Sequence, residues 1–310
     1  MKNKPFLIAL VLGVLLPCVM LLLVSRLYTG KERDPVEKLP EQRSLQVLMS
    51  DGTVYRMGLE DYVLGVVLGE MPASFEEEAL KAQAVVARTY ALREKRHQNA
   101  DICTDHTCCQ SYCDPKAYTG GEKALAKVRA AVYDTAGQVV TYEGELIEAT
   151  YFSCSGGKTE DAVAVWGQSV PYLQAVDSPG EEKSANYLKT VSMSASQFSA
   201  AFGGLSGSPS TWIGDITYTK GGGVATIVIG GSVYKGTQVR QKLGLRSTAF
   251  VITVVGSSVT ITTKGSGHRV GMSQYGADAM ALGGSSCEEI LMHYYPGTCL
   301  QGIDNIEALR

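Results

Sequence analysis

One carboxylic acid in this chain is placed for acid–base chemistry. Glu70 follows an apolar stretch, Tyr62 to Leu68, and directly precedes Met71 and Pro72. Surroundings of this kind desolvate a carboxyl group and raise its pKa toward the range where it donates a proton at neutral pH. A hydrolytic glycosidase needs two carboxyl groups, and the sequence places no obvious partner beside Glu70. One acid is enough if a hydroxyl of the sugar itself attacks. A Glu that only ends a helix is the alternative.

A run of cysteines and histidines forms a second reactive group between residues 97 and 113. Zinc prefers four such ligands in a tetrahedron. The spacing is not that of paired CxxC motifs, and no acid occupies the helper position of an HExxH protease, which favours a structural metal over a catalytic one. One or two local disulfides in an oxidising compartment are the alternative. The candidate ligands are His97, Cys103, His106, Cys108, Cys109 and Cys113.

Two glycine-rich segments offer polar groups for a cleft. Ser155-Gly156-Gly157 is a turn after an expected strand, and its glycines let backbone N–H groups approach a ligand closely. His268, Gln274 and Tyr275 come from a glycine-punctuated loop that enters a helix. Neither segment has the GxSxG spacing of a serine hydrolase. A tight turn and a structural histidine are the alternatives.

The elements that must position these groups mix helices with antiparallel strands, which predicts an α+β fold. Ser74 and Glu77 resemble a capping box at the start of a long helix, which should end near Lys95. Lys81 and Arg88 lie on this helix among small apolar residues, so we expect their face to be packed. The other expected elements are a hairpin at 44–57, helices at 59–69, 121–135 and within 271–295, strands at 138–142 and 146–152, and a strand-rich subdomain at 191–263.

The N-terminus predicts a location outside the cytoplasm. Residues 6–24 are uninterruptedly apolar and follow Lys2 and Lys4. A helix of about 19 residues nearly spans a hydrocarbon core of about 30 Å, and the lysines favour a cytoplasmic N-terminus. A cleaved signal peptide is the alternative, although no Ala-x-Ala site follows. We expect an anchor at 1–28, a tether at 29–43, one catalytic domain at 44–300 and a tail at 301–310. A net charge of −3 without basic clusters argues against a nucleic-acid partner.

Three sequence motifs in order resemble the stage II sporulation protein D family. They are GEMP followed by EALKAQAVVARTYALR, then YFSCSGGKTE, then GHRVGMSQYGADAMA. The resemblance spans roughly residues 44–299. It implies a peptidoglycan lytic transglycosylase of endospore-forming bacteria, which cleaves bonds between N-acetylmuramic acid and N-acetylglucosamine and leaves 1,6-anhydro ends. It also implies strands whose stem peptides a partner amidase has removed, other membrane proteins of the engulfment complex, and a mother-cell membrane that faces the forespore.

The resemblance also assigns roles to residues. It makes Glu70 the catalytic acid, and it implies that Lys81 and Arg88 either maintain the structure of the cleft or bind the substrate. The glycan groove is lined by Ser155, Gly156, Gly157, His268, Gln274 and Tyr275. Zinc ligands in some members match His97, Cys103 and Cys109. The chain departs from the family pattern at Cys108, where a histidine is frequent, which leaves the fourth ligand open, and at Arg269, where a glycine is frequent.

Two other function classes stay open. A zinc hydrolase would use the cysteine–histidine cluster for chemistry, with an open ligand position that holds water. A glycan-binding accessory protein would stimulate a cell-wall amidase without cutting the strand itself. The presence of Glu70 directly before Met71 and Pro72, as in the GEMP motif, favours catalysis.

Overall fold

The computed structural model describes residues 43–93 and 97–306. They belong to one unit of the chain that begins at Arg43. The predicted anchor at 1–28 lies outside the described residues, as does the tether at 29–43 apart from Arg43. Across the described ranges, no helix combines the length and the apolar character needed to span a bilayer.

A buried helix, α3 (Glu77–Arg93), organises the first part of the fold. Nearly every residue from Ala79 to Leu92 is buried, including the polar Gln83, Arg88 and Thr89, so the helix lies in the interior of the fold. It contacts four other helices and strand β4. The predicted helices at 59–69, 121–135 and within 271–295 are confirmed. The contacting elements are α2 (Leu59–Glu70), α4 (Glu122–Asp134), α8 (Gln274–Leu282), α9 (Cys287–Tyr294) and β4 (Gln138–Tyr142).

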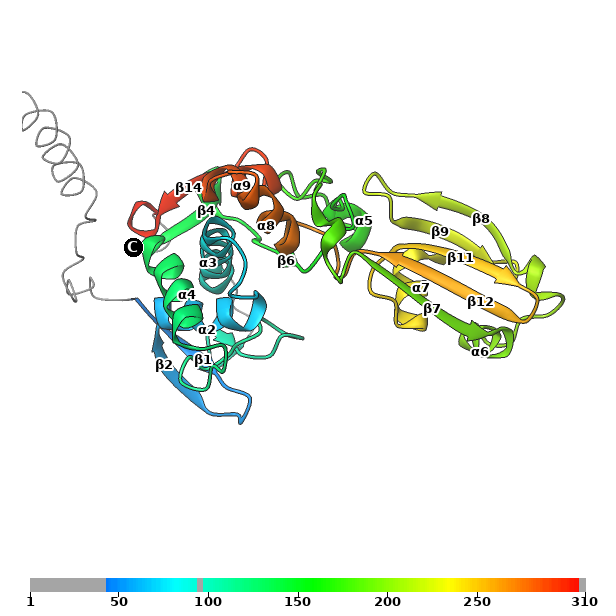
Figure 1. The fold of residues 1–310 in the computed structure, drawn as a ribbon, viewed down its shortest axis with the longest axis horizontal. Coiled ribbons are helices and arrows are strands. Elements are labelled where there is room, and N and C mark those ends of the chain that lie inside the picture. The colour runs from blue at the N-terminus through cyan, green and yellow to red at the C-terminus, as the bar shows by residue number, and fades with distance from the viewer. Residues whose placement is uncertain (1–42, 94–96, 307–310) are drawn as a thin grey trace, which may run out of the picture. The chain divides into compact units, whose positions relative to one another are not determined.

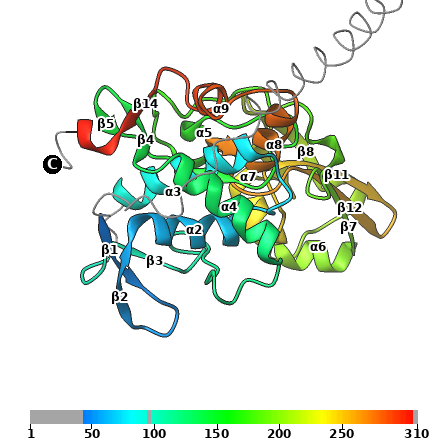
Figure 2. The ribbon, with the colours of Figure 1, turned by 60° about the vertical axis from the view of Figure 1, so that its left-hand side comes forward.

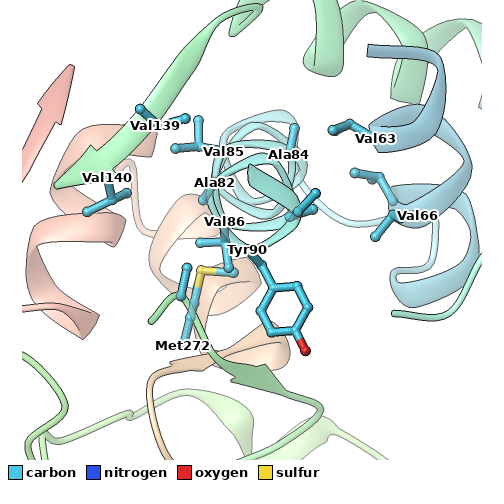
Figure 3. Packing of buried hydrophobic residues seen from close by; sticks show 14 of the residues in the cluster. Val63, Val66, Ala82, Ala84, Val85, Val86, Tyr90, Val139, Val140 and Met272 are labelled. Carbon is cyan, nitrogen blue, oxygen red and sulfur yellow. The ribbon is translucent and has the colours of Figure 1, made fainter. Parts of the chain in front are cut away.

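Figure 3 views α3 along its axis and shows how this core is filled. Val63 of α2 lies on one side of the helix and Val139 of β4 on the other, while Met272 lies beside Tyr90. Val63, Val139 and Met272 are fully buried. Burial of one such side chain stabilises a fold by roughly 1.5–3 kcal/mol. Dense packing around α3 therefore fixes α2 and the segment before α8 against the same helix.

Three small sheets flank these helices. Strands β1 (Ser44–Leu48) and β2 (Val54–Gly58) form the predicted antiparallel hairpin, and β3 (Ile102–Cys103) adds to β1 in parallel. The hairpin lies beside α2 in both views (Figures 1 and 2). The second sheet has the order β14-β4-β5, with β14 at Cys299–Gly302 and β5 at Glu145–Leu146. The third is the parallel pair β6 (Tyr151–Phe152) and β13 (Met272–Ser273).

The strand-rich subdomain is confirmed and extends from Leu188 to Lys264, a few residues beyond the prediction. Two three-stranded antiparallel sheets, β10-β9-β8 and β11-β12-β7, share a hydrophobic core with α6 and α7. Figure 1 shows these elements gathered together. Their bounds are β7 Leu188–Ser194, α6 Ala195–Ala201, β8 Ile213–Tyr218, β9 Val224–Ile229, β10 Ser232–Lys235, α7 Gly236–Leu243, β11 Ala249–Val255 and β12 Ser258–Lys264.

The structure corrects three details of the sequence prediction. The long helix begins at Glu77 rather than after Ser74, because Asp278 of α8 accepts the Glu76 amide (2.7 Å) and takes the place of a local cap. The strand predicted at 146–152 is divided into β5 and β6. The domain continues past residue 300, since β14 pairs with β4 and Ile306 is buried. A short helix, α5 (Ala162–Trp166), was not predicted.

Candidate active site

Glu70 is the last residue of α2, and three groups from distant segments hold its carboxylate. The Ser111 amide donates to Oε1 over 2.7 Å, and the side chains of Tyr151 and Gln274 also donate to the carboxylate. Burial raises the pKa of Glu70 above its ordinary value, and these hydrogen bonds offset part of that rise. The predicted desolvation of this acid is confirmed. Glu70 is therefore poised to donate a proton and is also supported once it has lost one.

The three donors converge because of one strand pair. Strand β6 runs parallel to β13, with Tyr151 opposite Met272 and Phe152 opposite Ser273. Gln274 follows β13 directly as the first residue of α8, and its side chain also meets Gln83 of α3 (3.5 Å). Two motifs that lie about 120 residues apart are thus joined beside Glu70. Burial raises the pKa of Tyr151 well above its ordinary value, which keeps its hydroxyl protonated as a donor.

Loop 104–113 lies directly against α2 and reaches Glu70. A side chain at Gly65 would collide with the Tyr112 ring, and one at Gly69 would press on Ser111, so these two glycines permit the close approach. The Cys113 amide donates to the Gly65 carbonyl (2.9 Å) and fastens the loop to the helix. Substitution of either glycine would push the Ser111 amide away from the catalytic candidate.

Glu70 opens into a pocket of about 750 Å³. This volume lies within the range of about 300–1,000 Å³ that is usual for small-ligand sites. The lining combines polar side chains with the exposed indole of Trp166. Besides Glu70, the lining includes His106, Cys109, Glu148, Tyr151, Trp166, His268 and Gln274. Glu148 places a second carboxylate on the same pocket. It was not predicted from the sequence, because it lies far from Glu70 in the chain.

His268 is brought into the pocket wall as predicted for a groove residue. Burial, together with the positive charge of Arg240, lowers its pKa to about 4, so the ring is neutral near pH 7. Its Nδ1 accepts the Val270 amide (3.1 Å), and the ring packs against Phe152 and Trp166, with centroid separations of 5.6 and 5.3 Å. These contacts suit a shaping role rather than proton transfer at neutral pH.

The Ser155-Gly156-Gly157 turn lies behind the pocket and binds Glu181. This buried carboxylate accepts the amides of Ser155 and Gly156 (2.8 and 2.9 Å) and the hydroxyls of Ser178 and Ser273 (2.7 and 2.6 Å). Ser273 immediately precedes Gln274. Glu181 therefore ties the glycine turn to the segment that presents Gln274, and no local sequence pattern indicated this role.

Three other predicted residues lie within the helical packing and do not line the Glu70 pocket. Lys81 forms ion pairs with Glu77 and Glu78, each at 2.9 Å. Arg88 is fully buried and donates to the Glu60 carboxylate and to main-chain carbonyls of α4 and β4. Tyr275 packs edge-on against Phe75 at 5.0 Å. Their substrate-binding roles stay predictions, while their packing contacts are established.

The four predicted metal ligands come together at one point. His97, Cys103, Cys108 and Cys109 place their donor atoms within 4.8 Å of one another. His97 Nε2 lies 3.4 Å from Cys109 Sγ and 3.7 Å from Cys108 Sγ, and the two sulfurs are 3.8 Å apart. Tetrahedral zinc with bonds of about 2.3 Å to sulfur and 2.0–2.1 Å to nitrogen requires about 3.5–3.6 Å for N···S and 3.8 Å for S···S. The donor set and its spacing fit such an ion.

The thiols of the cluster are not joined to one another. No disulfide joins two cysteines within the described ranges. Cys109 also lines the Glu70 pocket, and the next two residues reach the active-site candidates. Gln110 donates to the Tyr151 hydroxyl (3.1 Å) and Ser111 to Glu70. The cluster and the acid are therefore linked through the main chain.

Comparisons with known proteins show what this chain is similar to. A family model described as "Stage II sporulation protein" matches residues 50–142. The chain is 44% identical to stage II sporulation protein D of Bacillus amyloliquefaciens over 271 residues, which cover 84% of this chain and 77% of the relative. It is 42% identical to the Bacillus subtilis protein of the same name, with coverage of 81% and 77%. A Bacillus subtilis protein called "Amidase enhancer" is 32% identical over 76% of this chain and 40% of the relative.

Proposed function

The chain belongs to the stage II sporulation protein D family, and we propose that it is a peptidoglycan lytic transglycosylase with Glu70 as its catalytic acid and base. The observation that carries the proposal is the environment of Glu70. Its carboxyl lies on a pocket, burial raises its pKa, and Ser111, Tyr151 and Gln274 donate to it. A carboxyl group in this setting can hold a proton near neutral pH and release it to a substrate oxygen.

In the proposed reaction, protonated Glu70 donates to the glycosidic oxygen while the bond from that oxygen to C1 of N-acetylmuramic acid breaks. The Glu70 carboxylate then accepts the proton of the 6-hydroxyl of the same sugar, whose oxygen bonds to C1. One product carries a 1,6-anhydro ring, and the leaving sugar carries the donated proton. Glu70 ends protonated, and no water is consumed. The three hydrogen-bond donors stabilise its carboxylate between the two transfers.

The presence of Glu148 in the pocket makes hydrolysis a competing mechanism. Hydrolytic glycosidases use two carboxyl groups, and Glu148 lines the same pocket as Glu70. In the transglycosylase mechanism, Glu148 contacts substrate without transferring a proton. The chemical form of the new ends separates the two mechanisms, because hydrolysis leaves ordinary reducing ends.

We propose further that the cysteine–histidine cluster holds a structural zinc ion. The ligands would be His97, Cys103, Cys108 and Cys109, which fill all four tetrahedral positions with protein atoms. Zinc would supply a cross-link within the loop rather than a reactive water. Since Gln110 and Ser111 follow Cys109 directly, this cross-link would fix the donors that support Tyr151 and Glu70.

The cellular setting is proposed from the family and the N-terminal sequence. The apolar segment at 6–24 would anchor the protein as a single-pass membrane protein, with its N-terminus in the cytoplasm and its pocket outside. In a sporulating cell it would act from the mother-cell membrane that faces the forespore, during engulfment. Its substrate would be glycan strands freed of stem peptides by a cell-wall amidase, and other membrane proteins of the engulfment complex would be its partners.

The second candidate function is that of a glycan-binding protein that stimulates an amidase. The relative named "Amidase enhancer" favours it, although this chain spans only 40% of that protein. An accessory protein of this kind would bind strands and create no new sugar ends.

The deciding experiment incubates the full-length chain with peptide-free glycan strands and identifies the ends by mass spectrometry. We expect 1,6-anhydro ends from the wild type, a loss of at least about a hundredfold in Glu70→Gln, and continued anhydro formation in Glu148→Gln. Reducing ends that require both carboxylates would establish hydrolysis. Binding without cleavage would establish the accessory function, and full activity in Glu70→Gln would refute the mechanism.

A further inference from the structure

Trp166 is a large aromatic side chain that the core does not use. It is the last residue of α5, and 44% of its surface is exposed. Gly167 ends the helix in the left-handed conformation (φ 81°), and its amide donates to Val163. Trp212, by contrast, is buried in the strand-rich subdomain, stacks on Phe198 and donates through Nε1 to a main-chain carbonyl. An indole that is both exposed and held in place offers a ligand a flat apolar face with a fixed orientation.

The indole is held by a chain of rings. His268 packs against Trp166 at 5.3 Å and against Phe152 at 5.6 Å, and Phe152 is anchored in β6 beside Tyr151. The orientation of Trp166 is thus coupled to the strand that presents a donor to Glu70. Such support lowers the conformational entropy that a flat ligand must overcome when it stacks on the ring.

Trp166 also lines a second pocket, of about 450 Å³, as well as the pocket of Glu70. Val163, Ala164 and Val165 of α5 also line the second pocket, and the strand-rich subdomain supplies Lys235 and several threonines. The hydroxyl-bearing residues of this lining are Thr219, Thr226, Thr237 and Thr248. Trp166 therefore stands where the two pockets meet.

Glu160 adds a buried acceptor to the lining of the second pocket. Its Oε1 accepts from Thr219 (2.7 Å), from the Gly223 amide (2.9 Å) and from Arg269 (3.2 Å). Within the described residues its Oε2 has no hydrogen-bond partner, although the residue is 1% exposed. A buried acceptor without a donor is costly, and a ligand hydroxyl would satisfy it. The Lys235 ammonium adds attraction for a carboxylate.

We infer that Trp166 is a stacking platform for a pyranose ring and that the second pocket is a distal subsite for the same glycan strand. This inference rests on the proposed function, which places a scissile bond at Glu70. Sugar hydroxyls match the threonines and Glu160, while the carboxylate of a peptide-free muramic acid matches Lys235. The strand would pass from Glu70 over the indole into the second pocket, so affinity depends on strand length.

The test uses the full-length chain with Glu70→Gln, which keeps the strand intact. The chain has two tryptophans, so adding Trp212→Phe leaves Trp166 as the only indole. We expect its fluorescence to change with peptide-free strands of several disaccharides, and Trp166→Ala to weaken strand binding about tenfold in calorimetry. Trp166→Phe should restore most of that affinity. Should the Trp212→Phe variant fold poorly, the difference in emission between Glu70→Gln with and without Trp166→Phe reports the same contact.

Unchanged strand affinity in Trp166→Ala, or an unmoved Trp166 signal at saturation, would overturn the subsite. So would equal losses for one disaccharide and for long strands, because only long strands reach both pockets. Capture of a protein partner by Trp166 with no glycan effect would instead make the indole a protein contact. Failure of the proposed function would be seen separately, as strand cleavage that is retained in Glu70→Gln. The binding measurement does not depend on cleavage, so the two failures can be told apart.

Discussion

The Ser111 amide lies 2.7 Å from Oε1 of Glu70, although 41 positions separate the two residues in the chain. This contact couples the candidate acid to the loop that carries the cysteine–histidine cluster. Since Cys109 precedes Ser111 by two residues, the loop that carries the cluster also places a donor to Glu70. The relationship underlies two of the predictions below.

The first prediction concerns the pH dependence of cleavage. The reaction needs protonated Glu70, so kcat/KM should fall as pH rises through the pKa of Glu70, which burial places above its ordinary value. Tyr151→Phe removes a donor that stabilises the carboxylate, which raises this pKa further. The alkaline limb should therefore move to higher pH, and the maximal rate should fall by roughly tenfold. The measurement is the pH profile of anhydro-end formation, with Tyr118→Phe as control. A shift of the limb to lower pH would contradict the assignment.

The second prediction concerns metal removal. We expect purified full-length protein to hold about one zinc ion per chain, and Cys109→Ser or a chelator to lower both the zinc content and the melting temperature. Activity should also fall, because without the metal the loop is less ordered and no longer fixes Gln110 and Ser111 beside Tyr151 and Glu70. Elemental analysis and thermal unfolding are the measurements.

Cys113→Ser is the matched control for this experiment, since Cys113 lies in the same loop but outside the four-donor cluster. It should keep the metal and the melting temperature. Equal zinc loss in both variants would refute the ligand set. A chelator that stops turnover without changing the melting temperature would favour a catalytic metal.

The third prediction separates packing from substrate binding at Arg88. Its guanidinium and the Glu60 carboxylate form a buried pair, with Nε to Oε1 at 2.9 Å. Arg88→Met leaves Glu60 buried without its cation and should lower the free energy of unfolding by roughly 3–5 kcal/mol. Denaturant unfolding measures this change. The double variant with Glu60→Gln should recover part of the loss, and Lys123→Met at an exposed position should change stability by less than about 0.5 kcal/mol. A raised KM with unchanged unfolding would restore the predicted substrate role.

Local sequence patterns were enough to predict several features of this protein. The apolar run before Glu70 predicted both α2 and the desolvation of its last carboxyl, because burial of a helix face follows from the residues on it. The candidate ligands lie within 13 consecutive residues, so one loop can bring the donor atoms of His97, Cys103, Cys108 and Cys109 within 4.8 Å of one another. The strand-rich segment predicted at 191–263 was also evident locally, because it is rich in glycine and in β-branched residues, which are enriched in strands.

Helical spacing alone did not identify the partners of the two cations on α3. It placed Lys81 and Arg88 on a packed face, as observed, but could not say what packs there. Acidic residues of α2 and of α3 itself fill those positions, at Glu60, Glu77 and Glu78. A cation near an active site in sequence can thus be neutralised by the fold before any substrate arrives.

The sequence by itself singled out Glu70 as the candidate acid, the cysteine–histidine loop as a candidate metal site, and the resemblance to the family. Only the tertiary structure decided which groups meet Glu70 and where the pocket leads. Tyr151 and Gln274 come together through the parallel pairing of β6 and β13, and Glu148 and Trp166 join the same pocket from other segments. Such contacts depend on pairing between segments far apart in the chain, and no periodicity within either segment encodes its partner. The chemical type of a residue can be taken from the sequence, whereas its spatial neighbours depend on packing across the whole domain.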